Sequence, residues 1–186
     1  MRLSCLLAAA FTVVTTAAAS AQPAMVILVR HAERAAAPQA DPVLTDGGAQ
    51  RAVALKKALA TAGVSAVVAT QYQRTQLTAK PLMDSLGLTP VIVRAGNPLQ
   101  AHLDSVAAAV RRQASGSVIL VVGHSNTIPG IIAALGGPKM PDLCDDEYSF
   151  LYVMHYPAAG APQLVIANYG AADAPGSGAC TRTMRP

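Results

Sequence analysis

The amino-acid sequence predicts an α/β protein with three layers, an α/β/α sandwich in which helices cover both faces of a mostly parallel sheet. Short apolar runs rich in β-branched residues alternate with longer segments of helical periodicity, as in repeated strand-helix units. The runs are almost continuously apolar, which is typical of strands buried on both faces. With 186 residues, 52% of them hydrophobic and only 13% charged, the chain is long enough for one domain and too apolar for a disordered protein.

Six short segments are predicted to be strands. They are residues 25–29, 65–69, 91–93, 117–122, 150–154 and 164–167. The last two are separated by a short segment rich in Pro, Gly and Ala, which favours a hairpin.

The intervening segments predict four helices. The first starts at a Thr45 or Asp46 N-cap and ends at Gly63, because a short oxygen-bearing side chain favours a helix start and glycine favours an end. The others cover residues 75–86, 99–113 and 126–135. Pro81 falls inside the second and predicts a kink or a restart there.

The first 21 residues resemble a secretory signal peptide. Arg2 precedes an apolar stretch without acidic residues, and Ala19-Ser20-Ala21 has the small-residue pattern of a cleavage site. The alternative is an anchor that stays attached. No later run reaches the roughly 18 apolar residues of a membrane span. We therefore expect a secreted or periplasmic single domain at residues 22–186, not inserted in a membrane after cleavage, with an irregular tail from about residue 170.

Export changes how the cysteines are interpreted. Cys144 and Cys180 remain after cleavage, and an oxidising compartment favours a disulfide between them, with two unpaired thiols as the alternative. The cysteines and histidines lack the spacing of metal ligands, so we expect no metal and no cofactor. The basic residues are not interleaved with aromatics, which argues against a nucleic-acid partner.

Arginines and histidines follow three of the predicted strands. Arg30 and His31 follow the first, Arg74 comes shortly after the second, and His124 follows the fourth. Ligands of such sheets bind at the carboxyl ends of the strands. The planar guanidinium binds tetrahedral oxyanions, and nearby positive charge lowers the pKa of a histidine and leaves a neutral, nucleophilic imidazole. This combination favours phosphoryl transfer through a phosphohistidine.

Four segments, in order, resemble the signature segments of the histidine phosphatase superfamily, whose fold is phosphoglycerate mutase-like. They are Val29-Arg30-His31-Ala32-Glu33, Leu44-Thr45-Asp46-Gly47-Gly48, the stretch 69–79 containing Arg74-Thr75-Gln76-Leu77-Thr78-Ala79, and Gly123-His124-Ser125-Asn126-Thr127. The first departs from the usual Arg-His-Gly by having Ala32, whose extra carbon we expect to be tolerated.

The resemblance implies a role for each of these residues. His31 is the expected nucleophile, Arg30 and Arg74 bind the phosphoryl group, and His124 hydrogen-bonds one of its oxygens. Ser125 and Asn126 are expected to contribute to phosphate binding, and Tyr72 to form a pocket wall. The alternatives are a structural buried histidine at 31, a surface arginine at 74 and a helix-capping histidine at 124.

The general acid is the main departure from the family. Mutases and sugar-phosphate phosphatases of the superfamily carry a glutamate in the middle of the chain, but residues 80–112 contain none. Glu33 is the first candidate, with an ion pair to Arg34 or Arg51 as the alternative. Glu147 could approach the mouth of the site, with a solvated acidic turn as the alternative.

The predicted function is an exported phosphatase acting on phosphomonoesters or phosphohistidine through a covalent phosphohistidine at His31. Its partner is a phosphorylated small molecule or phosphoprotein. Because phosphohistidine has a better leaving group than an alkyl ester, the missing acid favours that substrate. A catalytically weakened phosphate-binding module and a phosphomutase are the alternatives.

Overall fold

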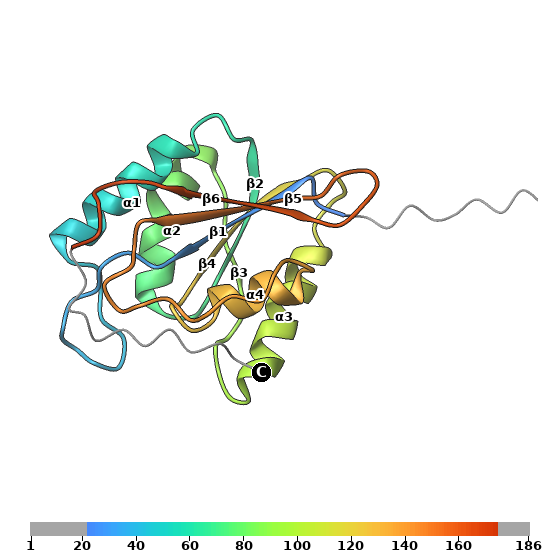
Figure 1. Ribbon diagram of the computed structural model, residues 1–186. Coiled ribbons are helices and arrows are strands. Elements are labelled where there is room, and N and C mark those ends of the chain that lie inside the picture. The colour runs from blue at the N-terminus through green and yellow to red at the C-terminus, as the bar shows by residue number, and fades with distance from the viewer. Residues whose placement is uncertain (1–21, 175–186) are drawn as a thin grey trace, which may run out of the picture.

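The computed structural model describes residues 22–174, and the predicted signal peptide and Cys180 lie outside this range. The described chain forms the predicted three layers, with helices on both faces of one sheet (Figure 1). In chain order the elements are β1 (Met25–Arg30), α1 (Asp46–Ala58), β2 (Val64–Ala69), α2 (Gln73–Leu86), β3 (Val91–Ile92), α3 (Leu99–Arg111), β4 (Val118–Gly123), α4 (Ile128–Ala134), β5 (Phe150–His155) and β6 (Gln163–Asn168).

The six strands form one mixed sheet in the order β3-β2-β4-β1-β5-β6. The first four of these run parallel to one another, whereas β5 and β6 form the predicted hairpin and run antiparallel. Strands β1 and β4 are neighbours whose last residues, Arg30 and Gly123, are paired. Consequently His31 and His124, which directly follow, leave the sheet side by side.

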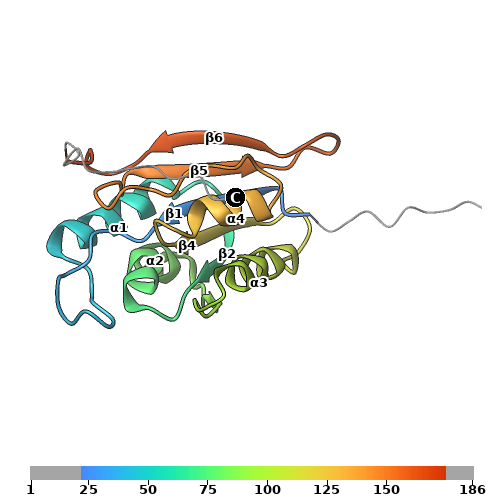
Figure 2. The same cartoon turned by 60° about the horizontal axis from the view of Figure 1, so that its bottom comes forward.

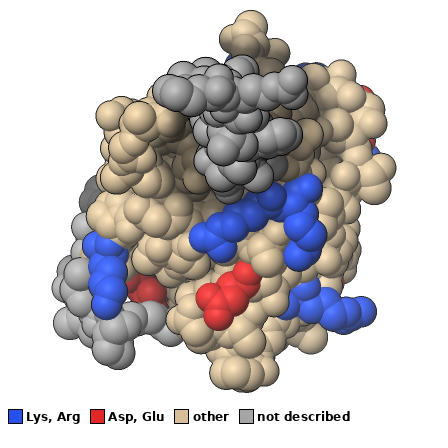
Figure 3. All heavy atoms as spheres, turned by 90° about the vertical axis from the view of Figure 1, so that its right-hand side faces the viewer, with Lys and Arg blue, Asp and Glu red and all other residues tan. Residues whose placement is uncertain are grey.

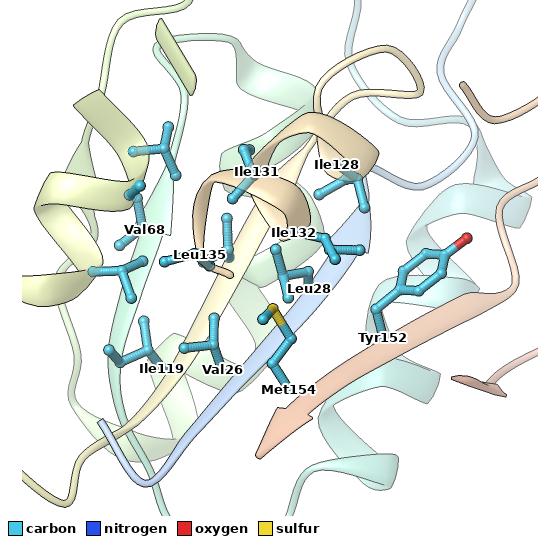
Figure 4. Close-up of a cluster of buried hydrophobic side chains, with 14 of the residues drawn as sticks. Val26, Leu28, Val68, Ile119, Ile128, Ile131, Ile132, Leu135, Tyr152 and Met154 are labelled. Atoms are coloured by element: carbon cyan, nitrogen blue, oxygen red, sulfur yellow. The ribbon is translucent and has the colours of Figure 1, made fainter. Parts of the chain in front are cut away.

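The core lies on both faces of the sheet because successive side chains of a strand point to opposite sides. Val26 and Leu28 of β1 pack towards α3 and α4, together with Tyr152 and Met154 of β5 (Figure 4). Ile27 and Val29 pack on the other face, against residues of α1 and α2. Figure 2 shows the sheet between these helices. Nearly every central strand residue is buried, which explains the absence of polar alternation in the sequence.

Some helix boundaries differ from the prediction and others agree with it. Helix α1 is capped by the Thr45 hydroxyl, as expected, but it ends at Ala58. Helix α2 begins at Gln73 and so includes Arg74 in its first turn, and it continues through Pro81 to a left-handed Gly87. Helix α4 begins at Ile128, with Pro129 in its first turn, where its lack of an N–H costs nothing.

Basic side chains are not confined to one place on the surface. Figure 3, which looks at the right-hand side of Figure 1, shows Lys and Arg around a few acidic side chains. The loop that follows β1 lies at the left of Figure 1.

Within residues 22–174, no helix is both long enough and apolar enough to cross a membrane.

Candidate active site

A polar cavity of about 360 Å³ opens beside the carboxyl ends of β1, β2 and β4. The topology brings seven of the predicted site residues together in its wall, from three segments that are distant in sequence. The residues that line it are Arg30, His31, Arg34, Gln39, Ala40, Tyr72, Arg74, His124, Ser125, Asn126 and Asp145. Tyr72 lines the pocket as expected, and Ser125 and Asn126 lie there too, while their predicted binding of phosphate stays a prediction.

His31 is held in one orientation by the backbone. The backbone N–H of His31 donates to the carbonyl of Gly123 at 2.9 Å, which ties the residue to β4. Its Nδ1 lies 2.8 Å from the carbonyl oxygen of Ala32. A carbonyl can only accept, so Nδ1 carries the proton, and in the neutral ring Nε2 is the atom with the free lone pair.

The surroundings keep this imidazole neutral. Burial, followed by the charges of His124, Arg30 and Arg74, lowers the pKa of His31 to about 3. Only 4% of the residue is exposed. At neutral pH His31 is therefore an unprotonated base with a defined nucleophilic nitrogen.

Ala32 joins the loop of His31 to α2. Its N–H donates to the Thr78 hydroxyl at 2.9 Å, and that hydroxyl donates to the carbonyl of Arg74 at 2.7 Å. Ala32 is fully buried, so the extra carbon relative to glycine is accommodated in the core. Thr78 therefore links the loop of His31 to the turn that carries Arg74.

His124 faces His31 with its ring centroid 5.3 Å away. Its Nε2 is 3.2 Å from the Thr70 hydroxyl, and the Tyr72 ring meets it edge-on at 5.6 Å. Burial and then the charge of Arg74 lower its pKa to about 3. Both histidines are consequently neutral, and the arginines supply the positive charge of the site.

Arg30 is buried and held by backbone oxygens. Its Nη1 donates to the carbonyls of Cys144, Asp145 and Glu147 at 2.7, 3.0 and 3.0 Å. Its guanidinium lies 4.0 Å from the centre of the Tyr148 ring. Carbonyl dipoles fix the group in place but do not cancel its charge.

Arg74 stacks on Tyr72, with the guanidinium carbon 4.1 Å from the ring centre. Its Nη1 is 3.9 Å from a carboxylate oxygen of Asp41, which also caps the first turn of α2 by accepting from the N–H of Gln73. The Nε atoms of Arg30 and Arg74 are buried and have no hydrogen-bond partner among the described residues. Buried donors of this kind are expected to have a partner, and an oxyanion is the complementary one.

The position of Glu33 does not suit the role of general acid. Its carboxylate accepts from Nε of Arg51 at 2.9 and 3.0 Å and from Nη2 at 2.8 Å, and Glu33 does not line the pocket. The ion pair with Arg51, considered as the alternative, is the arrangement found. The side chain that enters the pocket from this segment is Arg34.

Glu147 also turns away from the cavity. Its carboxylate accepts from the N–H of Cys144 at 2.8 Å and caps its own loop, whereas its backbone carbonyl contacts Arg30. The acidic residue at the pocket is Asp145, whose side chain is fully exposed and 3.8 Å from Nη2 of Arg30. The sequence analysis singled out Glu147 from the acidic run 145–147, but the member that lines the pocket is Asp145.

Two residues at the site have no sequence signal of their own. Gln39 lines the pocket and Tyr148 stacks on Arg30, and both are placed by loops whose path a local pattern does not specify. Cys144 is buried beside Arg30, and its predicted bond to Cys180 stays a prediction because Cys180 lies outside the described residues. No cluster of three or more metal-ligating side chains occurs within residues 22–174.

Residues 26–96 match the family described as Histidine phosphatase superfamily (branch 1). No curated protein sequence matches the chain. The fold is similar to that of a mycobacterial glucosyl-3-phosphoglycerate phosphatase, with a TM-score of 0.60 and 17% identity over 79% of this chain and 99% of the other.

Two further solved structures show the same relationship. A proposed phosphohistidine phosphatase SixA from Nakamurella multipartitia has a TM-score of 0.53 and 21% identity over 79% of this chain and 96% of the other. A proposed alpha-ribazole-5'-P phosphatase from Escherichia coli has a TM-score of 0.60 and 17% identity over 79% and 97%. At these identities the similarity establishes the fold. Together with the family match, it confirms the resemblance inferred from the four sequence segments.

Proposed function

Since residues 26–96 match the histidine phosphatase superfamily and the chain has the fold of that superfamily, we propose that it is an exported phosphatase that acts through a phosphohistidine at His31. One observation carries the proposal. The Nδ1 proton of His31 is committed to the Ala32 carbonyl, so Nε2 is left as a nucleophile in a pocket lined by three arginines.

In the first step the Nε2 lone pair attacks phosphorus, and the bond from phosphorus to the leaving group breaks. Arg30 and Arg74 bind the equatorial oxygens, where their fixed charges stabilise the transition state. Burial, and then the charge of Arg74, lowers the pKa of His124, so this ring acts as a neutral imidazole whose N–H donates to a phosphoryl oxygen.

In the second step water attacks phosphorus of the phosphohistidine. The bond between nitrogen and phosphorus breaks, the electron pair returns to Nε2, and inorganic phosphate leaves. The Nδ1 hydrogen bond to Ala32 is kept throughout, so His31 finishes in its starting tautomer.

The substrate we favour has a good leaving group. Within the described residues the only carboxylate that lines the pocket is that of Asp145, and it is fully exposed. An exposed carboxylate is poorly suited to be the proton donor that an alkyl leaving group requires. A phosphoramidate such as phosphohistidine loses its nitrogen more readily, which supports phosphohistidine or another activated phosphoryl donor over sugar phosphates.

Rapid quench labelling tests the enzyme proposal. The protein is mixed with [³²P]-labelled phosphohistidine peptide or p-nitrophenyl [³²P]phosphate and quenched in alkali or acid. We expect label that survives alkali and is lost in acid, as a phosphoramidate requires, and no label in His31→Asn. The control is His155→Asn, a histidine exposed at the end of β5. Full turnover by His31→Asn would contradict the mechanism, and phosphate binding without turnover would favour the binding-module alternative.

Export has its own test. The full chain, expressed with a C-terminal tag in a bacterium that has a periplasm, is expected in the periplasmic fraction with a new N-terminus at Gln22. Retention of Met1 in the cytoplasmic fraction would contradict export and leave the phosphatase proposal unaffected.

A further inference from the structure

Each of the two candidate phosphate-binding arginines lies on the face of a tyrosine ring. The guanidinium carbon of Arg30 is 4.0 Å from the centre of the Tyr148 ring. That of Arg74 is 4.1 Å from the centre of the Tyr72 ring. The chain has only five tyrosines and no tryptophan. Two of these few large aromatic rings therefore lie on the two arginines that the proposed reaction uses.

A tyrosine ring holds a guanidinium in a different way from a carboxylate. The negative face of the ring attracts the cation, but it does not occupy the N–H donors as carboxylate oxygens do. The carboxylates that form ion pairs with Arg30 and Arg74, those of Asp145 and Asp41, lie 3.8 and 3.9 Å away, beyond hydrogen-bonding distance. The rings therefore restrain the two groups without neutralising them.

Arg74 depends on its ring more than Arg30 does. Nη1 of Arg30 donates to three backbone carbonyls, which restrain its guanidinium independently of the ring. Within residues 22–174 the guanidinium of Arg74 has no hydrogen bond, and its other restraint is the ion pair of 3.9 Å with Asp41, whose side chain is 36% exposed. Such an ion pair contributes little. The Tyr72 ring is consequently the main restraint on the direction of Arg74.

The start of α2 fixes the position of Tyr72. This residue is the N-cap of the helix, and its carbonyl accepts from the Thr75 hydroxyl at 2.8 Å. The same carbonyl accepts from the N–H groups of Thr75 and Gln76 at 3.2 and 3.4 Å. The Tyr72 ring meets that of His124 in an edge-to-face contact, with centroids 5.6 Å apart. Its backbone and His124 thus give the ring a defined orientation, which it imposes on Arg74.

Tyr148 is fixed by the segment that follows β6. Its N–H and that of Ser149 both donate to Oδ1 of Asp173 at 2.9 Å, and the Ser149 hydroxyl donates to Oδ2 at 2.8 Å. The centre of the Tyr148 ring is 6.3 Å from that of His31. Tyr148 therefore lies beside the candidate nucleophile, as Tyr72 lies beside the second histidine.

We propose that Tyr72 is a positioning residue that acts through Arg74, and that Tyr148 has the same but weaker role toward Arg30. This inference rests on the proposed phosphatase function. Ordering a long side chain costs conformational entropy, and a ring that holds the guanidinium before the substrate arrives reduces that cost at the moment of binding. The ring face carries the effect, because the guanidinium lies over the ring centre.

Binding of inorganic phosphate, measured by isothermal titration calorimetry, tests the role without turnover. We expect Tyr72→Leu, which keeps apolar bulk but loses the ring, to weaken binding about threefold to thirtyfold, as loss of a cation–π contact predicts. Tyr72→Phe keeps the ring and should stay within about twofold of the unchanged protein. Tyr148→Leu should lose less than Tyr72→Leu, because the carbonyls still hold Arg30.

The matched control is Tyr156→Leu. Tyr156 is half-buried and follows the end of β5 that pairs with the start of β1, so it lies at the opposite end of the strands from the pocket. This variant should bind phosphate as the unchanged protein does. Tyr72→Met is a second variant without the ring, and failure of both Tyr72→Leu and Tyr72→Met to fold would overturn the inference in favour of a structural role.

A double-mutant cycle, measured by kcat/KM for p-nitrophenyl phosphate, separates positioning from a purely structural role. In Arg74→Gln protein, Tyr72→Leu should change kcat/KM by less than about twofold, because no guanidinium is left to position. In Arg30→Gln protein it should keep its full effect. An equal loss in both backgrounds, a loss in Tyr72→Phe as large as in Tyr72→Leu, or no loss in Tyr72→Leu would each overturn the inference.

The outcomes also separate this inference from the proposed function. Labelling of His31 together with unchanged phosphate affinity in Tyr72→Leu removes only the role of the tyrosines. Phosphate affinity that depends on Tyr72, in a protein that forms no phosphohistidine, removes the phosphatase proposal and leaves a phosphate-binding site whose arginine is positioned by a ring.

Discussion

Glu33 and Arg51 form a bidentate ion pair two residues past the nucleophile. Arg51 is buried on α1, and its Nη1 also donates to the carbonyls of Tyr169 and Ala171 at 3.1 and 3.0 Å. The pair therefore joins the segment after His31 to α1 and to the chain beyond β6. The carboxylate that was the first candidate for the general acid instead forms the alternative ion pair and stabilises the scaffold behind His31.

Glu33→Gln should consequently change stability more than chemistry. We expect the free energy of unfolding to fall by about 1–3 kcal/mol, because a charged hydrogen bond to a buried guanidinium is weakened. Turnover of an alkyl phosphate should stay within about threefold, whereas loss of a general acid costs 10²- to 10⁴-fold. Chemical denaturation and steady-state kinetics measure the two quantities. A hundredfold loss of kcat confined to substrates with poor leaving groups would restore Glu33 as the acid.

The two glycines at the start of α1 differ sharply in their surroundings. A Cβ on Gly48 would lie 2.2 Å from the backbone oxygen of Glu33, whereas one on Gly47 would make only an ordinary 3.7 Å contact with Thr45 Oγ1. We expect Gly48→Ala to lower the free energy of unfolding by about 2–4 kcal/mol, because α1 must move away from the nucleophile loop. Gly47→Ala, the matched control, should be neutral or slightly stabilising. Equal melting temperatures for the two variants would contradict this packing.

Thr78 should position His31 and Arg74 at once, since its hydroxyl bridges the Ala32 N–H and the Arg74 carbonyl. Thr78→Val keeps the shape but leaves a buried N–H without a partner, which we expect to cost about 1–3 kcal/mol of stability. It should also lower kcat more than it raises KM, because Arg74 and His31 lose their common support. Thr78→Ser is expected to restore much of the activity, and Thr61→Val on the exposed surface serves as the control. If Thr78→Ser is as impaired as Thr78→Val, the hydroxyl is not the cause.

Protonation of His31 should reduce activity only at an unusually low pH. Because the pKa of His31 is lowered to about 3, the nucleophile stays unprotonated far below the pH at which a free histidine takes up a proton. We expect kcat/KM, corrected for ionisation of the substrate, to show no loss from protonation of His31 between pH 7 and about pH 4.5. An enzyme group that titrates near pH 6.5 in this profile would contradict the neutral, buried state of His31.

The lowered pKa values of the two histidines should also make the folded chain less stable as the pH falls. His31 and His124 have pKa values of about 3 in the folded chain and about 6.5 when unfolded, so the unfolded chain binds more protons between these values. Stability is full above about pH 6.5 and falls as the pH decreases. From pH 7 to 5 we expect each histidine to account for about 1–2 kcal/mol of this loss. The loss should be smaller in His31→Asn than in His155→Asn, as measured by urea unfolding at each pH.

The sequence located all six strands. Strands β1, β2 and β4 are largely buried, and such strands are continuous apolar runs. Strands β3 and β6 lie exposed at the two edges of the sheet and were located from their β-branched residues. The sequence also located His31, Arg74 and His124, since chemistry in this architecture follows the carboxyl ends of strands. Helix boundaries were predicted less accurately. Helix α4 begins two residues later than expected, because the backbone carbonyl of His124 accepts from the N–H groups of Thr127 and Ile128 in a turn that precedes the helix.

The sequence by itself therefore determined the layers, the candidate nucleophile and the candidate phosphate-binding arginines, because each depends on local pattern and on a general rule about sheets. Only the tertiary structure decided between Glu33 and Arg34. Adjacent residues in an extended segment face opposite ways, and which one meets the pocket depends on the bridge to Leu44 and on Arg51 behind it. No local property of Glu33 or Arg34 carries that information, because it arises from contacts between segments that are distant in the chain.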